Sequence, residues 1–292
     1  MSNTTVLRSP GGASATVHHL GATVISWKTP TGKEMLHTSS KASFAPGGAI
    51  RGGVPVCWPQ FGPVGPWPKQ HGFARNLPWS VAELGADRAR FELRRAPLRP
   101  GDASPAPPEA VGEPAAFPSP FVLSLSVHVS DDRLEQTLRV ENPASAPGPL
   151  RFTAALHTYL AVEAGARRAA VRGLRGVSYV DNLDKATKTD EQDAVRFPGE
   201  VDRLYADAPT PLFLEDPEGR PRVRLDRRGF PDAVTWNPAE AKAAAMADLD
   251  DWSPFVCLES ANAAHGQIQL APGETWEGWH QLVDVTGAAS EL

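Results

Sequence analysis

"LSLSVHVSDDRLEQTLRVEN", residues 123–142, reads as two β-strands joined by a tight turn. Hydrophobic residues occupy every second position from Leu123 to Val129, and the same spacing returns from Leu134 to Val140 with only one polar interruption. Successive side chains of a strand point to opposite faces, so this period of two predicts strands with one buried face. The pair of aspartates between the two runs predicts the turn of a hairpin.

The same pattern recurs along the chain and indicates an all-β fold. Many short strands with few helices are typical of a sandwich or barrel of antiparallel sheet. One segment, residues 237–249 ("NPAEAKAAAMADL"), favours a short helix. Asn237 is predicted at its N-cap, Pro238 at its first position and Glu240 at the capping-box position. Further strands are predicted at residues 23–29, 222–226, 266–270 and 275–283.

The 292 residues are expected to form one domain, spanning residues 1–292, because all-β folds of this size often do. Residues 97–120 hold eight of the chain's 29 prolines, which predicts an exposed, extended loop inserted between strands. No internal repeat is visible.

Composition narrows the classes of function. A net charge of -5 does not suggest the basic face that nucleic acid requires. No apolar run approaches the roughly 18 residues of a membrane helix, and the N-terminus lacks a secretory pattern. We therefore expect a soluble cytoplasmic protein that binds neither membrane nor nucleic acid.

The two cysteines, Cys57 and Cys257, are each flanked by bulky apolar residues. Two buried free thiols in a reducing compartment is the favoured interpretation, and a disulfide is the alternative. A zinc site would need further ligands at close spacing, and none accompany either cysteine. No metal is expected.

"RGGVPVCWPQFGPVGPWPKQHGFARNLPW", residues 51–79, contains six prolines, so it can be neither a helix nor a central strand. It predicts a rigid aromatic loop, and it carries Arg51, Gln70, His71 and Arg75. The chain has no glycine loop of the nucleotide-binding types and no metalloprotease or serine-hydrolase motif.

Two further residues could exchange protons. His157 lies in the apolar run "RFTAALHTYLAV", and Glu259 follows the apolar "PFVCL". Taken alone, a residue of either kind is more often a hydrogen-bonded core residue than a catalyst, although a buried carboxylate is costly without a partner. Reference pKa values of about 6.5 and 4.3 would suit an acid–base pair. The 102 positions between them leave open whether they meet.

Six ordered blocks resemble one family. The chain is similar to the hexose-6-phosphate mutarotases, the glucose-6-phosphate 1-epimerase branch of the aldose 1-epimerase family, from about residue 20 to residue 282. The resemblance implies a large twisted antiparallel β-sandwich of the galactose mutarotase type. It also implies interconversion of α and β anomers without cofactor or metal. The blocks are "GGVPVCWPQFGP", "KQHGFARNLPW", "ALHTYLAV", "GLRGVSYVDNL", "EVDRLY" and "VTWNP" through "FVCLES".

The resemblance also implies roles for individual residues. Glu259 would be the general base that takes the proton from the anomeric hydroxyl, and His157 the general acid that protonates the ring oxygen. The ring would open to the aldehyde and close again to the opposite anomer.

Substrate binding is implied in the same way. Arg51 and Arg75 would lie nearest the phosphate of a hexose 6-phosphate, since guanidinium groups bind phosphate through charge-assisted hydrogen bonds. Gln70 and His71 would contact the sugar, with His71 orienting or assisting. Asp202 of "EVDR" would hold sugar hydroxyls.

Other interpretations stay open at this stage. The arginines could pair with surface acids. The chain departs from the family at Val201, where threonine is usual, and at Ala239, where an aromatic residue is usual. Tyr159, Tyr179 and Trp236 could line the groove or pack in the core.

Two alternative functions follow. One is a mutarotase for neutral aldoses, which the two arginines argue against. The other is a non-catalytic carbohydrate-binding or regulatory sandwich, which retention of both His157 and Glu259 argues against. We expect a monomer.

Overall fold

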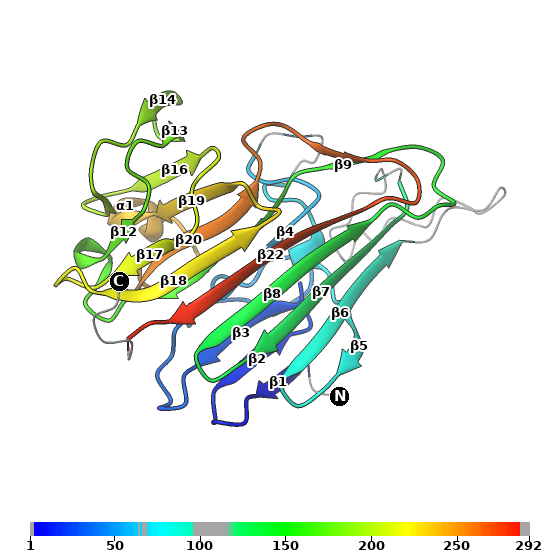
Figure 1. The fold of residues 1–292 in the computed structure, drawn as a ribbon, viewed down its shortest axis with the longest axis horizontal. Helices are drawn as coiled ribbons and strands as arrows, with labels where there is room; N and C mark the ends of the chain where they lie inside the picture. Colours follow the sequence, from blue (N-terminus) through cyan, green and yellow to red (C-terminus); the bar gives the residue numbers. More distant parts are fainter. Residues whose placement is uncertain (1–2, 64, 66–68, 96–116, 118, 287–292) are drawn as a thin grey trace.

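The computed structural model describes residues 3–63, 65, 69–95, 117 and 119–286. Nearly all of the proline-rich segment 97–120 lies outside these residues, so its predicted loop is not tested. Strands dominate, and two large antiparallel sheets form the body of the fold (Figure 1). The expected all-β sandwich is confirmed.

The larger sheet has nine strands. In spatial order they are β15 (Ala194–Arg196), β12 (Ala170–Arg172), β17 (Leu212–Glu215), β18 (Pro221–Arg228), β22 (Thr275–Asp284), β8 (Arg133–Glu141), β7 (Phe121–Val129), β6 (Arg88–Arg95) and β5 (Ser80–Leu84).

The second sheet has eight strands. Seven follow the order β14 (Ala186–Thr189), β13 (Ser178–Asp181), β16 (Val201–Tyr205), β19 (Asp232–Asn237), β20 (Phe255–Asn262), β10 (Ala154–Leu156) and β4 (Val56–Cys57). The eighth, β11 (Tyr159–Ala161), also pairs with β20.

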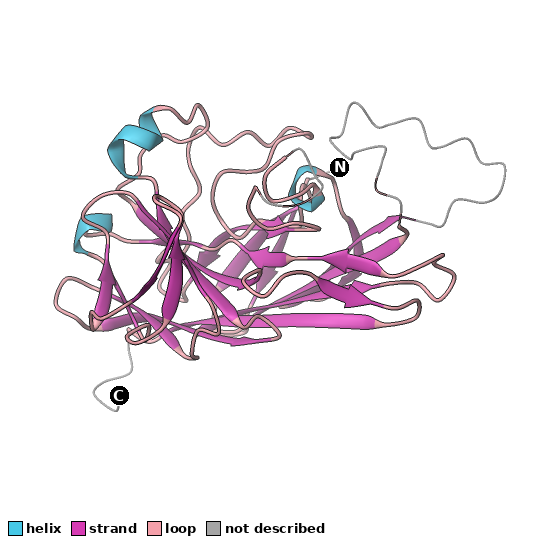
Figure 2. Ribbon diagram, turned by 90° about the horizontal axis from the view of Figure 1, so that it is seen from above, coloured by secondary structure: helices cyan, strands magenta, loops and turns pink. Residues whose placement is uncertain are grey.

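Among the described residues, two small sheets and three short helices accompany the two large sheets. Figure 2 shows the helices and long loops gathered on one side, opposite the side along which the longest strands run. The small sheets are β1 (Thr4–Arg8), β2 (Ser14–His18) and β3 (Thr23–Lys28), and β9 (Leu150–Phe152) with β21 (Ile268–Leu270). The helices are α1 (Ala239–Ala244) and the 3₁₀ turns η1 (Ala74–Asn76) and η2 (Ala166–Arg168).

The predicted hairpin is present. β7 and β8 pair antiparallel up to the contact of Val129 with Leu134, next to the turn. Leu125 and Leu138 face each other across the pair and are fully buried. Burying a leucine side chain contributes about 1.5–3 kcal/mol, so this face anchors the larger sheet to the core. The strands predicted at 23–29, 222–226, 266–270 and 275–283 correspond to β3, β18, β21 and β22.

The predicted helix exists but begins differently. β19 runs through Asn237, so Pro238 becomes the N-cap and Ala239 opens the helix with a φ of 52°. The capping box expected at Glu240 is wrong, because such a box needs a backbone N–H at the N-cap and proline has none. The Asn237 side chain instead accepts from the Ala239 N–H at 2.9 Å and donates to the Phe255 carbonyl at 2.8 Å.

Strand β20 is buried on both faces, which explains its continuous apolar run. Val256 and Leu258 belong to the large core between the sheets. Phe255 and Cys257 belong to a second apolar cluster on the other face of the eight-stranded sheet. With a period of two, Glu259 points to the same side as Cys257, away from the large core.

The described residues of 51–79 form an irregular, mostly buried segment in which β4 is the only strand, so neither a long helix nor a central strand runs through them. At two positions the backbone conformation of this segment requires glycine. Gly53 has a φ of 64°, and a Cβ there would lie 2.1 Å from the Val24 carbonyl oxygen. Gly72 has a φ of 69°, and its Cβ would lie 2.2 Å from the Trp58 carbonyl oxygen. A side chain at either position would therefore displace the segment.

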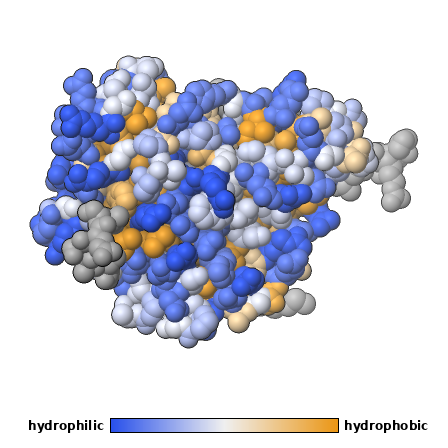
Figure 3. Space-filling view, viewed as in Figure 1, coloured by the Kyte–Doolittle hydropathy of each residue, from blue (hydrophilic) through white to orange (hydrophobic). Residues whose placement is uncertain are grey.

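On the face drawn in Figure 3 hydrophilic residues prevail, and hydrophobic ones occur in small separate patches. Within the described part of the chain, no helix is long and apolar enough to cross a membrane.

A polar bridge crosses the large core. His280 of β22 is fully buried. Its Nδ1 lies 3.0 Å from the Ser260 hydroxyl of β20, and its Nε2 lies 3.2 Å from Gln136 Oε1 of β8. A neutral ring with its proton on Nε2 satisfies both contacts, because Nε2 then donates to Gln136 and Nδ1 accepts from Ser260. Burial, helped by the charge of Arg227, lowers the pKa of His280 to about 3.

This bridge predicts acid sensitivity of the fold. Unfolded His280 takes up a proton near pH 6.5, whereas the folded residue does so only near pH 3. Between these values the unfolded state binds more protons, so stability falls as the pH falls. From pH 7.5 to pH 4.5, we expect the wild type to lose on the order of 2 kcal/mol more unfolding free energy than His280→Gln. Urea unfolding at the two pH values measures this, and equal losses would contradict it.

Candidate active site

A groove of about 400 Å³ lies beside the eight-stranded sheet, on the side that faces away from the large core. The structure brings to this one groove all seven residues that the sequence singled out. They come from the 51–79 segment, from the β10–β11 connection and from strands β16 and β20. The seven are Arg51, Gln70, His71, Arg75, His157, Asp202 and Glu259.

His157 and Glu259 face each other at the bottom of the groove. His157 lies between β10 and β11, and its backbone N–H donates to the Pro55 carbonyl at 3.0 Å. Both of these strands pair with β20, which carries Glu259. His157 Nε2 is 3.4 Å from Glu259 Oε1, and the two side chains are only 8% and 1% exposed. Sheet pairing thus joins two residues that are 102 positions apart.

Burial shifts both groups toward their neutral forms. It raises the pKa of Glu259 well above its ordinary value, and the nearby charge of Asp202 adds to this while Arg75 opposes it. Burial also lowers the pKa of His157 well below 6.5, with the charges of Arg75 and Arg51 acting in the same direction. The burial of the pair therefore favours a carboxylic acid beside a neutral imidazole. This form differs from a carboxylate beside an imidazolium by one proton transfer.

Several buried polar atoms in the groove lack partners among the described residues. They are Glu259 Oε2, His157 Nδ1 and Arg75 Nε. An unsatisfied buried polar group costs about 1–3 kcal/mol. A hydroxylated ligand in the groove could satisfy such atoms, so the site is prepared for polar contacts that the protein itself does not make.

His71 is held by contacts through both ring nitrogens. Its Nδ1 accepts from the Gly62 N–H at 3.1 Å, and its Nε2 lies 3.0 Å from the Gln70 side-chain amide. Its ring stands edge-on to that of His157, with centroids 5.4 Å apart. Its φ of 67° is unusual for a residue other than glycine. His71 is thus positioned beside His157 and is less available for proton exchange.

The two arginines differ in their partners. Arg51 Nε and Nη2 lie 3.1 and 3.0 Å from Asp248 Oδ2, and Nη1 donates to the Tyr159 hydroxyl at 3.2 Å. Arg75 donates from Nη2 to the Gln70 carbonyl at 3.0 Å. Among the described residues, no carboxylate forms an ion pair with Arg75. Arg51 is therefore ion-paired with a carboxylate, whereas Arg75 has no such ion pair in the part of the chain that the structure describes.

Asp202 lies across the groove on β16. Its Oδ1 accepts from the Asn182 side chain at 2.8 Å. Val201, the neighbour that departs from the family pattern, is buried in the large core, on the other side of the strand from Asp202. Having valine in place of threonine there therefore leaves Asp202 in the groove. Trp236 lines the groove, whereas Tyr179 packs against Tyr205.

Sequence reasoning missed several residues of the groove wall. Lys185 and Lys242 add two more cations, and Lys242 is paired with Glu200 at 2.6 Å. Asn182 positions Asp202. The "DNLDK" turn at 181–185 was the available signal, because it follows a strand and concentrates polar side chains. The other missed residues of the lining are Phe61, Gly62, Pro63, Val234 and Met246.

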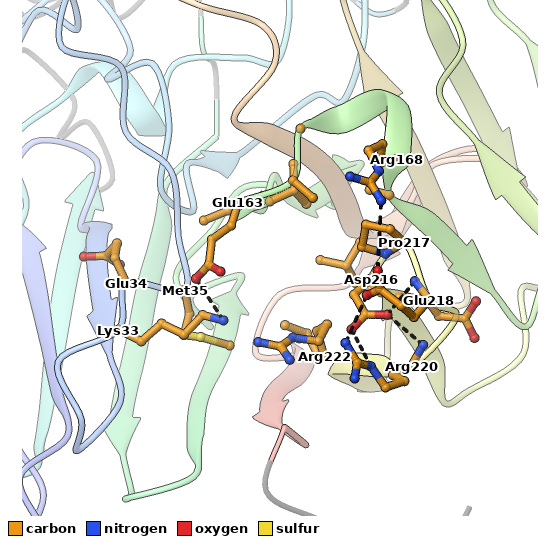
Figure 4. Close-up of a pocket in the computed structure, with 18 residues that line it drawn as sticks. Lys33, Glu34, Met35, Glu163, Arg168, Asp216, Pro217, Glu218, Arg220 and Arg222 are labelled. Atoms are coloured by element: carbon orange, nitrogen blue, oxygen red, sulfur yellow. Dashed lines mark hydrogen bonds and ion pairs between the residues drawn. The ribbon is translucent and has the colours of Figure 1, made fainter.

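A second pocket contains none of the seven predicted residues (Figure 4). Several of its charged side chains pair with one another. Lys33 contacts Glu163 at 3.0 Å, and Arg220 contacts Asp216 at 2.9 Å. Surface pairs of this kind contribute little stability and leave no strong field for a charged ligand. The pocket therefore offers less chemistry than the groove.

Fold and groove together define the class of protein. It is a β-sandwich whose polar groove holds a buried imidazole–carboxylate pair. Beside this pair lies Arg75, which forms no ion pair with a described residue. Such a site is suited to moving protons on a small hydroxylated anion.

Comparison with known proteins is consistent with this class. Residues 3–282 match the model of the aldose 1-epimerase family, and the chain belongs to that family. Two relatives carry the name "Putative glucose-6-phosphate 1-epimerase". The one from Cenchrus ciliaris is 38% identical over 280 residues, covering 94% of this chain and 82% of its own. The one from Escherichia coli K12 is 31% identical over 255 residues, covering 85% and 79%.

The fold has solved counterparts. A crystal structure described as a "putative mutarotase" from Salmonella typhimurium superposes with a TM-score of 0.79 at 28% identity. The match covers 95% of this chain and 88% of that one. The galactose mutarotase-like sandwich expected from the sequence is therefore confirmed.

Proposed function

We propose that this protein interconverts the α and β anomers of hexose 6-phosphates, chiefly glucose 6-phosphate. The observation that carries the proposal is the 3.4 Å contact between His157 and Glu259 at the bottom of a groove that also contains Arg75. Membership of the aldose 1-epimerase family and the names of the two relatives support it.

The proposed reaction needs two proton transfers. As its carboxylate, Glu259 takes the proton of the anomeric hydroxyl. As its imidazolium, His157 gives a proton to the ring oxygen, and the C1–O5 bond breaks. The open aldehyde rotates about C1–C2. Closure runs the same transfers in reverse, so the pair returns to its starting state.

The pair can reach this working form without exchanging protons with solvent. One proton transfer from Glu259 to His157 converts the neutral pair that burial favours into the carboxylate and imidazolium that the reaction needs. A bound phosphate would offset the charges of Arg75 and Arg51 and so raise the pKa of His157. Offsetting Arg75 would also raise the pKa of Glu259, so the net gain for this transfer would come from offsetting Arg51.

The phosphate is assigned first to Arg75. A sugar phosphate carries about -1.5 to -2 charges at neutral pH. Arg75 forms no ion pair with a described carboxylate, whereas Arg51 is already paired with Asp248. Arg51, held in its ion pair with Asp248, would add a second positive charge near the phosphate. Gln70, His71 and Asp202 are assigned to the sugar, with Asp202 accepting from its hydroxyls.

Arg75→Ala should raise KM for glucose 6-phosphate about 10- to 100-fold and change KM for free glucose little. Losing a charge-assisted contact costs about 1.5–3 kcal/mol, and only the phosphorylated sugar makes it. Anomer exchange followed by NMR on both sugars measures the two constants.

Lys242→Ala is the matched control, because Lys242 lines the same groove but is paired with Glu200. It should leave both constants near wild type. An equal rise for the two sugars in Arg75→Ala would favour the alternative, a mutarotase of neutral aldoses. Activity with neither sugar in the wild type would favour the non-catalytic alternative.

Three further expectations are kept as part of the proposal. The protein acts as a monomer, and the chain forms one domain. It works in the cytoplasm, which is supported by the two cysteines being free thiols.

A further inference from the structure

Three possible metal ligands meet beneath the groove. The nitrogen of His157, the sulfur of Cys257 and a carboxylate oxygen of Glu259 all lie within 4.8 Å of one another, and all three residues are buried. Cys257 and Glu259 are two positions apart on β20, so both side chains project to the groove side. His157 reaches them from the β10–β11 connection, which pairs with β20 on both flanks.

The spacing is close to that of a zinc site. Zinc bonds of about 2.0–2.3 Å to N, O and S place two tetrahedral ligands about 3.3–3.6 Å apart. His157 Nε2 and Glu259 Oε1 are already 3.4 Å apart. The sulfur of Cys257 would have to approach by at most about 1.2–1.5 Å, which a rotation of its side chain can provide.

A second observation points to a ligand at this place. Glu259 is 1% exposed, it lines the groove, and its Oε2 has no partner among the described residues. Three protein ligands of mixed type with an open side toward a groove are the arrangement in which zinc keeps an exchangeable fourth ligand. The pattern was invisible in the sequence, because His157 is 100 positions from Cys257.

We propose that the groove binds one Zn²⁺ through His157, Cys257 and Glu259, and that the bound ion blocks the acid–base pair. The metal occupies the lone pair of the imidazole and the carboxylate oxygen, so neither group can exchange a proton with a sugar. The effect on rate rests on the proposed function, whereas the binding does not.

Binding is tested directly with the metal alone. Equilibrium dialysis should give one Zn²⁺ per chain. When Co²⁺ replaces zinc in the wild type, the absorption spectrum should show a thiolate-to-cobalt charge-transfer band. This band tests for a cysteine ligand without any variant. Cys257→Ser should lower zinc affinity at least about tenfold and abolish the band. Cys57→Ser is the matched control, because Cys57 is an equally buried thiol of the same apolar cluster but lies outside the three ligands. It should bind both metals like wild type.

The consequence is tested in the exchange assay at buffered free zinc. Zinc should inhibit the wild type and Cys57→Ser, and a chelator should restore their rates. Cys257→Ser should keep the basal rate and need at least about tenfold more zinc for the same inhibition. No stoichiometric binding, a cobalt spectrum without the thiolate band, equal affinity in both serine variants, or zinc binding without inhibition would each overturn the inference. If instead the proposed function were wrong, the zinc-free protein would show no anomer exchange, while its metal binding would be as expected.

Discussion

Glu259→Gln is expected to lower kcat for glucose 6-phosphate exchange by about 10²- to 10⁴-fold, the range that general acid–base catalysis supplies. The amide has the shape of the carboxylic acid but can neither take nor return a proton. Because burial already favours the uncharged form of Glu259, a neutral amide should be accommodated without loss of stability. NMR exchange spectroscopy measures the rate, after subtraction of the spontaneous reaction.

The chain offers a close control for this change. Glu215 is also a buried carboxylate, at 4% exposed, but it pairs with Arg172 and lines the second pocket. Glu215→Gln should retain the wild-type exchange rate, while circular dichroism shows that both variants are folded. A Glu259→Gln rate within a few-fold of wild type would remove the carboxylate from the mechanism.

His157→Asn is expected to have a loss of similar size, about 10²- to 10⁴-fold in kcat, because asparagine cannot protonate the ring oxygen. The ring of His157 also stacks on that of Tyr159 with centroids 4.9 Å apart. A modest fall in thermal stability is therefore expected as well. The same exchange assay, with thermal unfolding alongside, separates the two effects.

His71→Asn is the informative comparison. His71 stands next to His157, but its two ring nitrogens are engaged by Gly62 and Gln70. Replacing an orienting residue of this kind should lower kcat less than about tenfold. If kcat fell as much in His71→Asn as in His157→Asn, or more, His71 and not His157 would have to be the general acid.

The strands were predictable because their signal is local. A period of two in residues 123–142 depends only on which face of a strand is buried, and the structure has the corresponding hairpin. The start of the helix was predicted wrongly for a nonlocal reason. β19 extends through Asn237, whose side chain is bonded to the Phe255 carbonyl of β20. Pairing with a distant strand thus decided where the helix could begin.

Six of the seven groove residues stood out by residue type and setting, whereas Asp202 and the role of each residue came from a family resemblance. That resemblance could identify His157 and Glu259 but could not give the distance or the burial of the pair. The compensation of Arg51 by Asp248, 197 positions away, was likewise hidden. The difference between the two arginines, on which the phosphate assignment depends, is a property of the folded chain.

By itself, then, the sequence determined the all-β class, the hairpin, the irregular 51–79 segment and the chemical types gathered there. These follow from short-range rules of side-chain alternation and of proline and glycine geometry. Only the tertiary structure decided that an imidazole, a thiol and a carboxylate share one buried place, and in which protonation forms. Contacts and desolvation are set by strand pairing between residues far apart in the chain, and no local pattern encodes them.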